Sequence, residues 1–394
     1  MFTCAKLSIY IGKIKNQNQN RSSHIRSLVS FSSLPACAST CPMGRPKKLR
    51  NLIGILKDKA SLLKAALLFS YNSSSIRIAV LRATTHDPSA PPSDDRVDAV
   101  LSFGLDSRTT SCACIEALMD RLHHTQNATV SLKCLIVLHN IVARGSFILK
   151  DQLSFYPSAG GRNFLNLSRF RDESDADTWE LSSWVRWYAG VLEQNLMASR
   201  ILGSYFGSSS RIVEKNTEEK VSALLNSVLL SELDALVGFI ERLCEAPNSL
   251  QKNNLVYEIV RLVGDDYRFA QYEIFSRVTE CEDRTGNLSS SELAQLLCGL
   301  KRLEDYKERL MVLFVNRKRN DAFWDLISQT RVKLVTVKEQ REERRLVMKG
   351  RREESSELTR FRERVAGSGH LFRFSSDGPG LDVDRARLTI SAVR

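Results

Sequence analysis

The sequence contains no apolar run that approaches the roughly 18 residues of a membrane-spanning helix, because charged or polar residues interrupt every candidate. Its nine cysteines are odd in number and show neither paired C-x-x-C spacing nor a Cys/His metal pattern. We therefore expect a reduced, cytosolic protein in which Cys134, Cys244 and Cys298 are small core residues. If a membrane is involved, the protein is expected to lie on its surface.

Motifs of the common catalytic and nucleotide-binding sites are also missing. The chain has no P-loop, no G-x-G-x-x-G after a strand, no H-E-x-x-H and no G-x-S-x-G. The adjacent His123 and His124 have no further ligands at metal spacing, so a solvated pair is expected and no metal site. The sequence therefore predicts no catalytic residues and no cofactor, and an enzyme is disfavoured.

Acidic residues are absent from the first 42 positions, which carry five lysines and arginines. The formal net charge of the whole chain is +12, and most of the excess lies in the first half. A basic first half fits an anionic partner, either a membrane surface or a nucleic acid. The basic stretches lack aromatic platforms, so nucleic-acid binding is not expected. Basicity without a specific partner is the remaining alternative.

Residues 1–42 resemble an organelle transit peptide in composition, since they are rich in serine and basic residues. The alternative is a basic extension that precedes a domain starting at Met43. In either case the composition cannot support a packed core, so this extension is predicted to be disordered.

Beyond Met43 the spacing of apolar residues is helical throughout. The stretch from Ala128 to Ala143 is apolar nearly all round, which is typical of a central buried helix. Asp177 is expected to cap a helix from Thr178 to Leu202, and Ser289 and Glu292 form a capping box that opens a later helix. The predicted fold is all-α, with a curved stack of antiparallel helix pairs followed by a long helical bundle.

A run of small residues marks the main internal boundary, at Gly203 and at Gly207 with the three serines after it. We expect one helical part from 43 to 206, a C-terminal helical bundle from 207 to 364, and a disordered tail from 365 to 394.

The stretch from Leu49 to Leu68 has the pattern of a basic amphipathic helix. Apolar residues fall near helical spacing, and lysines and arginines from Arg45 to Lys64 supply a polar face. Such a helix can lie in a bilayer interface, although an ordinary surface helix gives the same pattern.

Four basic residues lie at or beside a predicted helix-loop-helix corner. Apolar residues from Ile76 to Ala83 indicate the end of one helix, prolines then break the chain, and Ser93-Asp94-Asp95 opens the next helix. The candidate binding residues at this corner are Arg77, Arg82, His86 and Arg96.

Three sequence blocks resemble one protein family. They are Arg-Ala-Thr-Thr-His-Asp at 82–87, the helix Leu132–His139, and Asn166–Asp172 followed by Trp184–Tyr188. In order and spacing they resemble the ANTH domain of phosphoinositide-binding clathrin assembly proteins, in the plant style, over roughly Met43 to Arg364. The resemblance implies an ENTH/ANTH-like superhelical fold, with the membrane-binding part at 43–206.

The resemblance also implies partners and a location. An ANTH protein is an endocytic adaptor that connects phosphatidylinositol 4,5-bisphosphate in membranes to clathrin and retrieves vesicle SNAREs through a groove in its helices. Its expected locations are clathrin-coated pits at the plasma membrane, clathrin-coated vesicles and the Golgi. Only about thirty residues follow Arg364, without the short clathrin-binding peptides of the family, which argues against direct clathrin recruitment.

The candidate lipid site departs from the family arrangement, in which a lysine is followed about ten residues later by further basic residues. Arg82 and His86 match that arrangement, but Ser93-Asp94-Asp95-Arg96 supplies one cation and two acids in the second cluster. Since each basic residue near an anionic surface contributes about 1 kcal/mol, weak or altered phosphoinositide binding is expected. The alternatives are solvated helix-end charges and a helical protein-interaction scaffold with little or no lipid binding.

Overall fold

All secondary structure in the described residues is helical. The computed structural model describes residues 47–68, 71–154, 164–206, 219–248, 253–314 and 317–366, and none of them forms a strand. The all-α prediction is therefore confirmed for this part of the chain. The predicted extension at 1–42 lies outside the described residues, as does most of the predicted tail.

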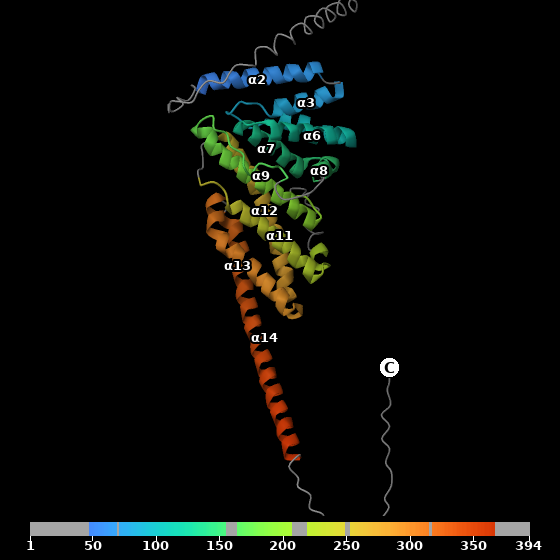
Figure 1. Cartoon of the computed structure of the whole chain (residues 1–394), viewed down its shortest axis with the longest axis vertical. Helices are drawn as coiled ribbons and strands as arrows, with labels where there is room; N and C mark the ends of the chain where they lie inside the picture. Colours follow the sequence, from blue (N-terminus) through green and yellow to red (C-terminus); the bar gives the residue numbers. More distant parts are fainter. Residues whose placement is uncertain are drawn as a thin grey trace, which may run out of the picture. The chain divides into compact units, whose positions relative to one another are not determined.

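The helices of the first half form a stack (Figure 1). They are α2 (Lys47–Leu68), α3 (Tyr71–Ala83), α4 (Asp94–Leu101), α5 (Phe103–Asp106), α6 (Arg108–His124), α7 (Ala128–Arg144), α8 (Phe147–Ser154) and α9 (Ala176–Leu202). Helix α3 packs on α4 and α6, and α6 packs on α7 and α8. The short helices α5 and α8 were not expected from the sequence pattern.

Helix α7 lies at the centre of this stack. Every residue from Ala128 to Val142 is buried, as the apolar pattern of this segment predicted. The helix packs on α6 and α9 and reaches α12 in the second half. His139 on α7 contacts Tyr188 on α9 through Nδ1 at 2.9 Å and Asp266 on α12 through Nε2 at 3.3 Å, which joins the two halves inside the core.

The second half is a bundle of long helices. It contains α11 (Asn226–Cys244), α12 (Asn254–Asp283), the short 3-10 helix η1 (Thr285–Asn287), α13 (Ser290–Leu313) and α14 (Arg317–Ala366). Helix α11 packs on α9, α12 and α13, while α14 packs on α13 and α12. A buried Arg277 pairs with Glu232 and Glu273, each at 2.5 Å, and fixes α12 against α11. The superhelical stack followed by a bundle thus matches the sequence prediction.

Helix starts follow local side-chain chemistry. The capping box of Ser289 and Glu292 is present and opens α13, as predicted. The prediction that Asp177 caps the helix after it is wrong, because Asp175 is the N-cap of α9 and forms its box with Thr178. Both aspartates precede the same apolar pattern, and only the backbone path between them decides which one accepts the helix N–H groups.

The cysteine prediction is correct at two of three positions. Cys134 and Cys244 are buried, and burial raises the pKa of each thiol to about 12. Cys298 is exposed, so its assignment to the core is wrong. Cys298 lies on α13 next to positions that do enter the core, and a helix in a bundle always keeps one face in solvent.

Candidate functional site

The predicted corner exists and connects α3 to α4. Ile76, Val80 and Ala83 face the core, and the Thr84 hydroxyl donates to the Val80 carbonyl at 2.7 Å, which ends α3. The loop runs from residue 84 to residue 93, and α4 begins at Asp94. The apolar side of α3 is thereby fixed, and its basic residues lie on the remaining faces.

Lys133 on the central helix α7 forms hydrogen bonds to the loop of this corner. Its ammonium donates to the Thr85 hydroxyl at 3.0 Å and to the Asp87 carbonyl at 2.7 Å. The residue is 2% exposed, and this burial lowers the pKa of Lys133 to about 8. The sequence analysis did not select Lys133 as a site residue, since a lysine in an apolar helix carries no local signal of what it contacts.

Arg82 and Arg96 come together at the surface of the corner. Arg96 donates from Nη1 to the main-chain carbonyl of Arg82 at 3.2 Å, and both residues are exposed. Within the described residues neither guanidinium lies within ion-pair distance of a carboxylate. Arg96 is thereby held beside the end of α3, where Arg82 is also exposed, and both side chains are accessible to an anionic ligand.

The nearby acids are held by a residue that the sequence analysis did not consider. Arg144, the last residue of α7, lies 3.3 Å from Asp94 and 3.0 Å from Asp98 through its two terminal nitrogens. All three side chains are substantially exposed, so the pairing contributes at most about 1 kcal/mol. It nevertheless offsets part of the negative charge that the sequence places beside Arg96.

His86 lies on the other side of the loop, under α2. Asp58 on α2 accepts a hydrogen bond from the His86 main-chain N–H at 2.9 Å, and its other oxygen lies 2.6 Å from Nδ1 of His86. Arg121 on α6 approaches the same carboxylate at 3.6 Å. Burial alone would raise the pKa of Asp58, but the bonds to His86 and the neighbouring charges outweigh burial and lower it.

Glycine makes this contact between α2 and the loop possible. A Cβ atom at Gly54 would lie 2.8 Å from the Cβ atom of His86, which is closer than two carbons can approach. The absence of a side chain at Gly54 therefore lets the α3–α4 loop pack directly on α2. His86 is consequently paired with α2 and does not join Arg82 and Arg96.

Arg77 is also separated from the two exposed arginines. Its guanidinium lies 3.6 Å from Asp120 on α6. It lines a cavity of about 410 Å³ between α2, α3 and α6, together with Lys64 and Arg121. The structure thus brings together two of the four predicted residues, Arg82 and Arg96, and places Arg77 and His86 in contacts beneath α2.

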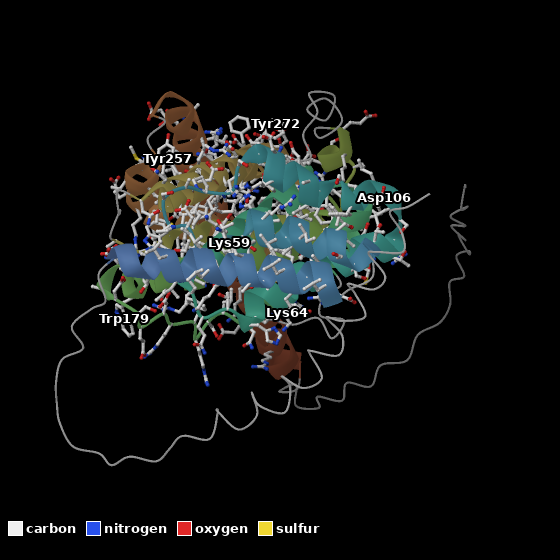
Figure 2. The ribbon with its side chains drawn as sticks, turned by 90° about the horizontal axis from the view of Figure 1, so that it is seen from above. Lys59, Lys64, Asp106, Trp179, Tyr257 and Tyr272 are labelled. Carbon is white, nitrogen blue, oxygen red and sulfur yellow. The ribbon has the colours of Figure 1, made fainter. Side chains whose placement is uncertain are left out.

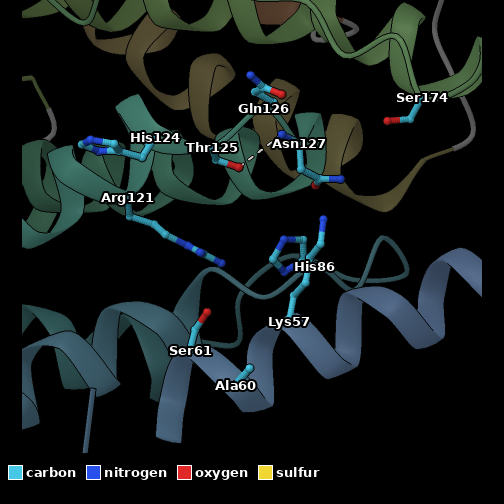
Figure 3. A pocket seen from close by; sticks show the side chains of 10 residues that line it. All are labelled: Lys57, Ala60, Ser61, His86, Arg121, His124, Thr125, Gln126, Asn127 and Ser174. Carbon is cyan, nitrogen blue, oxygen red and sulfur yellow. Dashed lines mark hydrogen bonds between the residues drawn. The ribbon is translucent and has the colours of Figure 1, made fainter. Parts of the chain in front are cut away.

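A second cavity under α2 gathers further basic groups (Figure 3). It measures about 570 Å³ and lies between α2, the end of α6 and the start of α7. Its basic residues are Lys57, His86, Arg121 and His124. In Figure 3, Lys57 projects from α2 to the space beside His86, and Arg121 extends toward it from α6. Arg121 and His124 are neighbours on α6, but Lys57 and His86 are distant from them in sequence, so no local pattern could have grouped all four.

Helix α2 turns an apolar stripe to solvent. Its exposed apolar residues, 47% to 80% accessible, are Leu52, Ile55, Leu56, Leu63 and Leu67. Only Gly54 and Ala65 are fully buried in the described part of the helix, so α2 rests on the body through small side chains. Lys59 lies within the stripe and Lys64 beside it at helical spacing, and α2 lies across the face shown in Figure 2. The apolar residues of the amphipathic pattern are therefore not buried in the core of the described structure.

A groove runs between α9 and α11. It measures about 610 Å³, and its apolar and small lining residues are Ala189, Gly190, Met197, Ile201, Ala235 and Gly238. Arg302 of α13 borders it and is paired with Glu241 and Asp234 at 2.7 Å and 2.6 Å. Polar side chains also line it, since the Arg242 guanidinium lies against Gly190 and the Gln194 amide lies near Gly238. A groove with both apolar and charged lining residues suits an extended or helical peptide.

Two further observations concern what the described residues do not contain. None of their helices is both long and apolar enough to cross a bilayer. They also contain no group of three or more histidine, cysteine, aspartate or glutamate residues that could hold a metal ion.

Comparison with known proteins places these features in a family. The family model described as the ANTH domain matches residues 75–316, which include the corner and the groove. A protein of Arabidopsis thaliana is 44% identical over 361 residues, which is 89% of this chain and 99% of that protein. Two others are 33% and 31% identical and cover 70% and 72% of this chain, and 83% and 98% of their own lengths. All three carry the name "putative clathrin assembly protein".

A search of solved structures found the ENTH domain from epsin-2, in complex with phosphatidylinositol 4,5-bisphosphate. The match has a TM-score of 0.40 and 12% identity, and covers 63% of this chain and 99% of that one. At this level of similarity it adds no argument about function.

Proposed function

This chain belongs to the ANTH domain family, and we propose that it is a non-enzymatic endocytic adaptor that binds membranes containing phosphatidylinositol 4,5-bisphosphate. The observation that carries the proposal is the exposed pair of Arg82 and Arg96 at the α3–α4 corner, inside the matched ANTH region. Guanidinium groups bind phosphate through two parallel hydrogen bonds, so two adjacent arginines suit a phosphorylated head group.

The remaining predicted residues have supporting roles in this proposal. His86 and Arg77 stay part of the proposed site through the cavities beneath α2, where Lys57, Lys64 and Arg121 add positive charge. Two exposed arginines at about 1 kcal/mol each give weak binding when they act alone. The apolar stripe of α2 can add affinity by entering the interface of the bilayer, with Lys59 and Lys64 near the anionic lipids.

The groove between α9 and α11 is the proposed site for a vesicle SNARE. SNARE motifs are amphipathic helices, and an apolar groove with a charged rim binds such helices by their apolar face. Clathrin is a further proposed partner, based on the names of the relatives. The proposed locations are clathrin-coated pits and vesicles and the Golgi.

Liposome co-sedimentation tests the lipid proposal. The wild-type chain is expected to pellet with vesicles that contain phosphatidylinositol 4,5-bisphosphate and to remain in solution with neutral vesicles. Arg82→Glu should reduce pelleting several-fold, since it removes one donor and adds a repulsive charge. Arg108→Glu is a matched control, because Arg108 is exposed at the start of α6 and pairs with Asp151 away from the corner. Equal pelleting on both vesicle types would refute recognition of the phosphatidylinositol 4,5-bisphosphate head group.

A helical protein-interaction scaffold with little lipid binding is the second candidate. The observation that favours it is that His86 contacts Asp58 and Arg77 contacts Asp120. Both residues thus contact carboxylates of the protein itself and are less accessible to a lipid head group. The localisation of a fluorescently tagged chain separates the two candidates. An adaptor should gather at spots on the plasma membrane that Arg82→Glu disperses, whereas a scaffold should be distributed identically with and without the substitution.

A further inference from the structure

The last helix continues beyond the bundle that supports it. Its buried residues Phe323, Trp324, Ile327 and Leu334 pack on the bundle, and Leu334 is the last fully buried residue described in α14. Arg341 attaches α14 to the segment before α13, donating to the carbonyls of Leu288 and Thr285 at 2.5 Å and 2.7 Å. Figure 1 shows α14 running on past α12 and α13.

Charges on this projecting part are segregated by side. At about 100° per residue, the seven cations between Lys338 and Arg352 fall within an arc of about 160° around the helix. The three acids of the same segment, Glu339, Glu342 and Glu343, fall outside this arc, and Glu342 at its edge lies 3.9 Å from Lys338. Between Lys338 and Arg352, one side of the helix is therefore mainly basic and the other mainly acidic.

This arrangement is unfavourable for a helix that stands alone. Residues three and four apart are neighbours on a helix, and like charges at that spacing repel each other. From Lys338 to Arg352 there are seven like-charged pairs at these spacings and two of opposite charge. A solvated helix with no partner is stabilised by opposite charges at these spacings. The excess of like-charged neighbours therefore indicates that this segment binds a charged ligand.

An exposed methionine lies at the centre of the basic side. Met348 is 69% exposed, and arginines occupy the positions four and three residues before it and three and four residues after it. They are Arg344, Arg345, Arg351 and Arg352, all exposed, and within the described residues none of them forms an ion pair. We call Met348 and these four arginines the Met348 patch.

We propose that the Met348 patch docks an acidic segment of a partner protein. Arginine forks bind carboxylates in bidentate fashion, and methionine is an adaptable apolar anchor in the middle of such a contact. The partner's carboxylates would relieve the repulsion among the arginines, while the acidic side of α14 stays in solvent. The patch is carried by the helix that packs on α12 and α13, so it is separate from the proposed lipid corner on α3 and α4.

The test exchanges charges without altering the composition. The variant Glu342→Arg, Glu343→Arg, Arg344→Glu, Arg345→Glu keeps the net charge of the chain. It changes the neighbour pairs from seven like and two opposite to three like and six opposite, counted over the same residues. Binding of a fluorescein-labelled poly-L-glutamate peptide to the full-length chain is measured by anisotropy at low and at physiological salt.

Wild type is expected to bind the peptide at least tenfold more tightly than the exchanged variant, with the difference shrinking as salt rises. Circular dichroism should show helicity in the variant that equals or exceeds that of wild type, which excludes unfolding as the cause. Equal peptide binding by the two proteins would overturn the proposal. A variant that loses binding to phosphatidylserine vesicles but keeps peptide binding would also overturn it, in favour of a membrane contact. The proteins compared all keep Arg82, so a difference in peptide binding between them does not depend on the proposed lipid corner, and the proposed lipid function can fail independently.

Discussion

Asp58 on α2 bonds to His86 on the α3–α4 loop twice, once through the main-chain N–H at 2.9 Å and once through Nδ1 at 2.6 Å. The apolar residues of α2 are largely exposed, and the same carboxylate also lies 3.6 Å from Arg121 on α6. Asp58 therefore attaches α2 to the body in addition to the packing of the buried Gly54 and Ala65.

Asp58→Asn should loosen α2. An amide cannot accept from both groups with a negative charge, and hydrogen bonds to a charged group contribute about 1.5–3 kcal/mol each. Hydrogen exchange of the α2 amides should accelerate about tenfold or more, while the amides of α7 keep their protection. Lys59→Gln is the control, because this exposed residue lies on the same helix away from the loop. Unchanged α2 protection in Asp58→Asn would show that the small buried residues hold the helix alone.

Acid should have the same effect as that substitution. The pKa of Asp58 is lower in the folded protein than in the unfolded chain, where it is near 3.8. Its contribution is therefore fully present above that value and is lost as pH falls through the folded pKa. Exchange of α2 amides in wild type should accelerate, after correction for intrinsic rates, as pH drops below about 4. The Asp58→Asn variant should lack this step.

Lys133 should make stability depend on alkaline pH. Burial lowers its pKa from 10.5 to about 8, so between these values the unfolded chain binds more protons than the folded one. The free energy of unfolding should rise with pH in this window by up to about 1.4 kcal/mol per pH unit from this residue. In urea unfolding, the free energy of unfolding of wild type relative to Lys133→Met should be larger at pH 9.5 than at pH 7.5. A constant difference between the two proteins would contradict a neutralised Lys133.

Arg144 should support lipid binding without being a ligand. Its pairs with Asp94 and Asp98 reduce negative charge beside Arg96, so Arg144→Ala should weaken binding to phosphatidylinositol 4,5-bisphosphate vesicles. The expected effect is about two- to fivefold, since exposed pairs contribute at most about 1 kcal/mol. Arg108→Ala removes the same charge at an exposed pair elsewhere and should have a smaller effect. Equal losses in both variants would mean that only net charge matters.

Gly104 should tolerate no side chain. A Cβ atom there would overlap Leu149 and Ser146, so Gly104→Ala must displace the α5–α8 contact. We expect a loss of about 1–3 kcal/mol in the free energy of unfolding, measured by urea denaturation. Gly286→Ala is the matched control, because nothing lies within 4 Å of its added Cβ. Similar stabilities of the two variants would indicate that α5 shifts without cost.

The sequence predicted the helices well where one local pattern was decisive. The apolar run of α7, the Ser289–Glu292 capping box and the helix-breaking prolines before α4 each depend on neighbouring residues alone. The cap of α9 and the exposure of Cys298 were missed because they depend on the path and packing of whole helices. The solvent exposure of the last part of α14 was readable from sequence, because Lys338 to Arg364 carries charges of both signs and few apolar residues.

The candidate site shows the same limit. Arg82 and Arg96 could be paired from the sequence, since one short loop separates them. The orientation of His86 could not, because its partner Asp58 lies 28 residues away on a helix whose position local patterns do not determine. The same holds for Lys133, 48 residues from Thr85, and for Arg144, 50 residues from Asp94.

By itself, the sequence determined that this protein is helical and has an arginine-bearing corner, because helix periodicity, capping and turn chemistry act over a few residues. Its membership of the ANTH family was indicated by the resemblance of three sequence blocks. Tertiary structure alone decided which charges reach solvent and which are neutralised. Ion pairs and burial depend on distances between segments far apart in the chain, and those distances are set only when the helices pack.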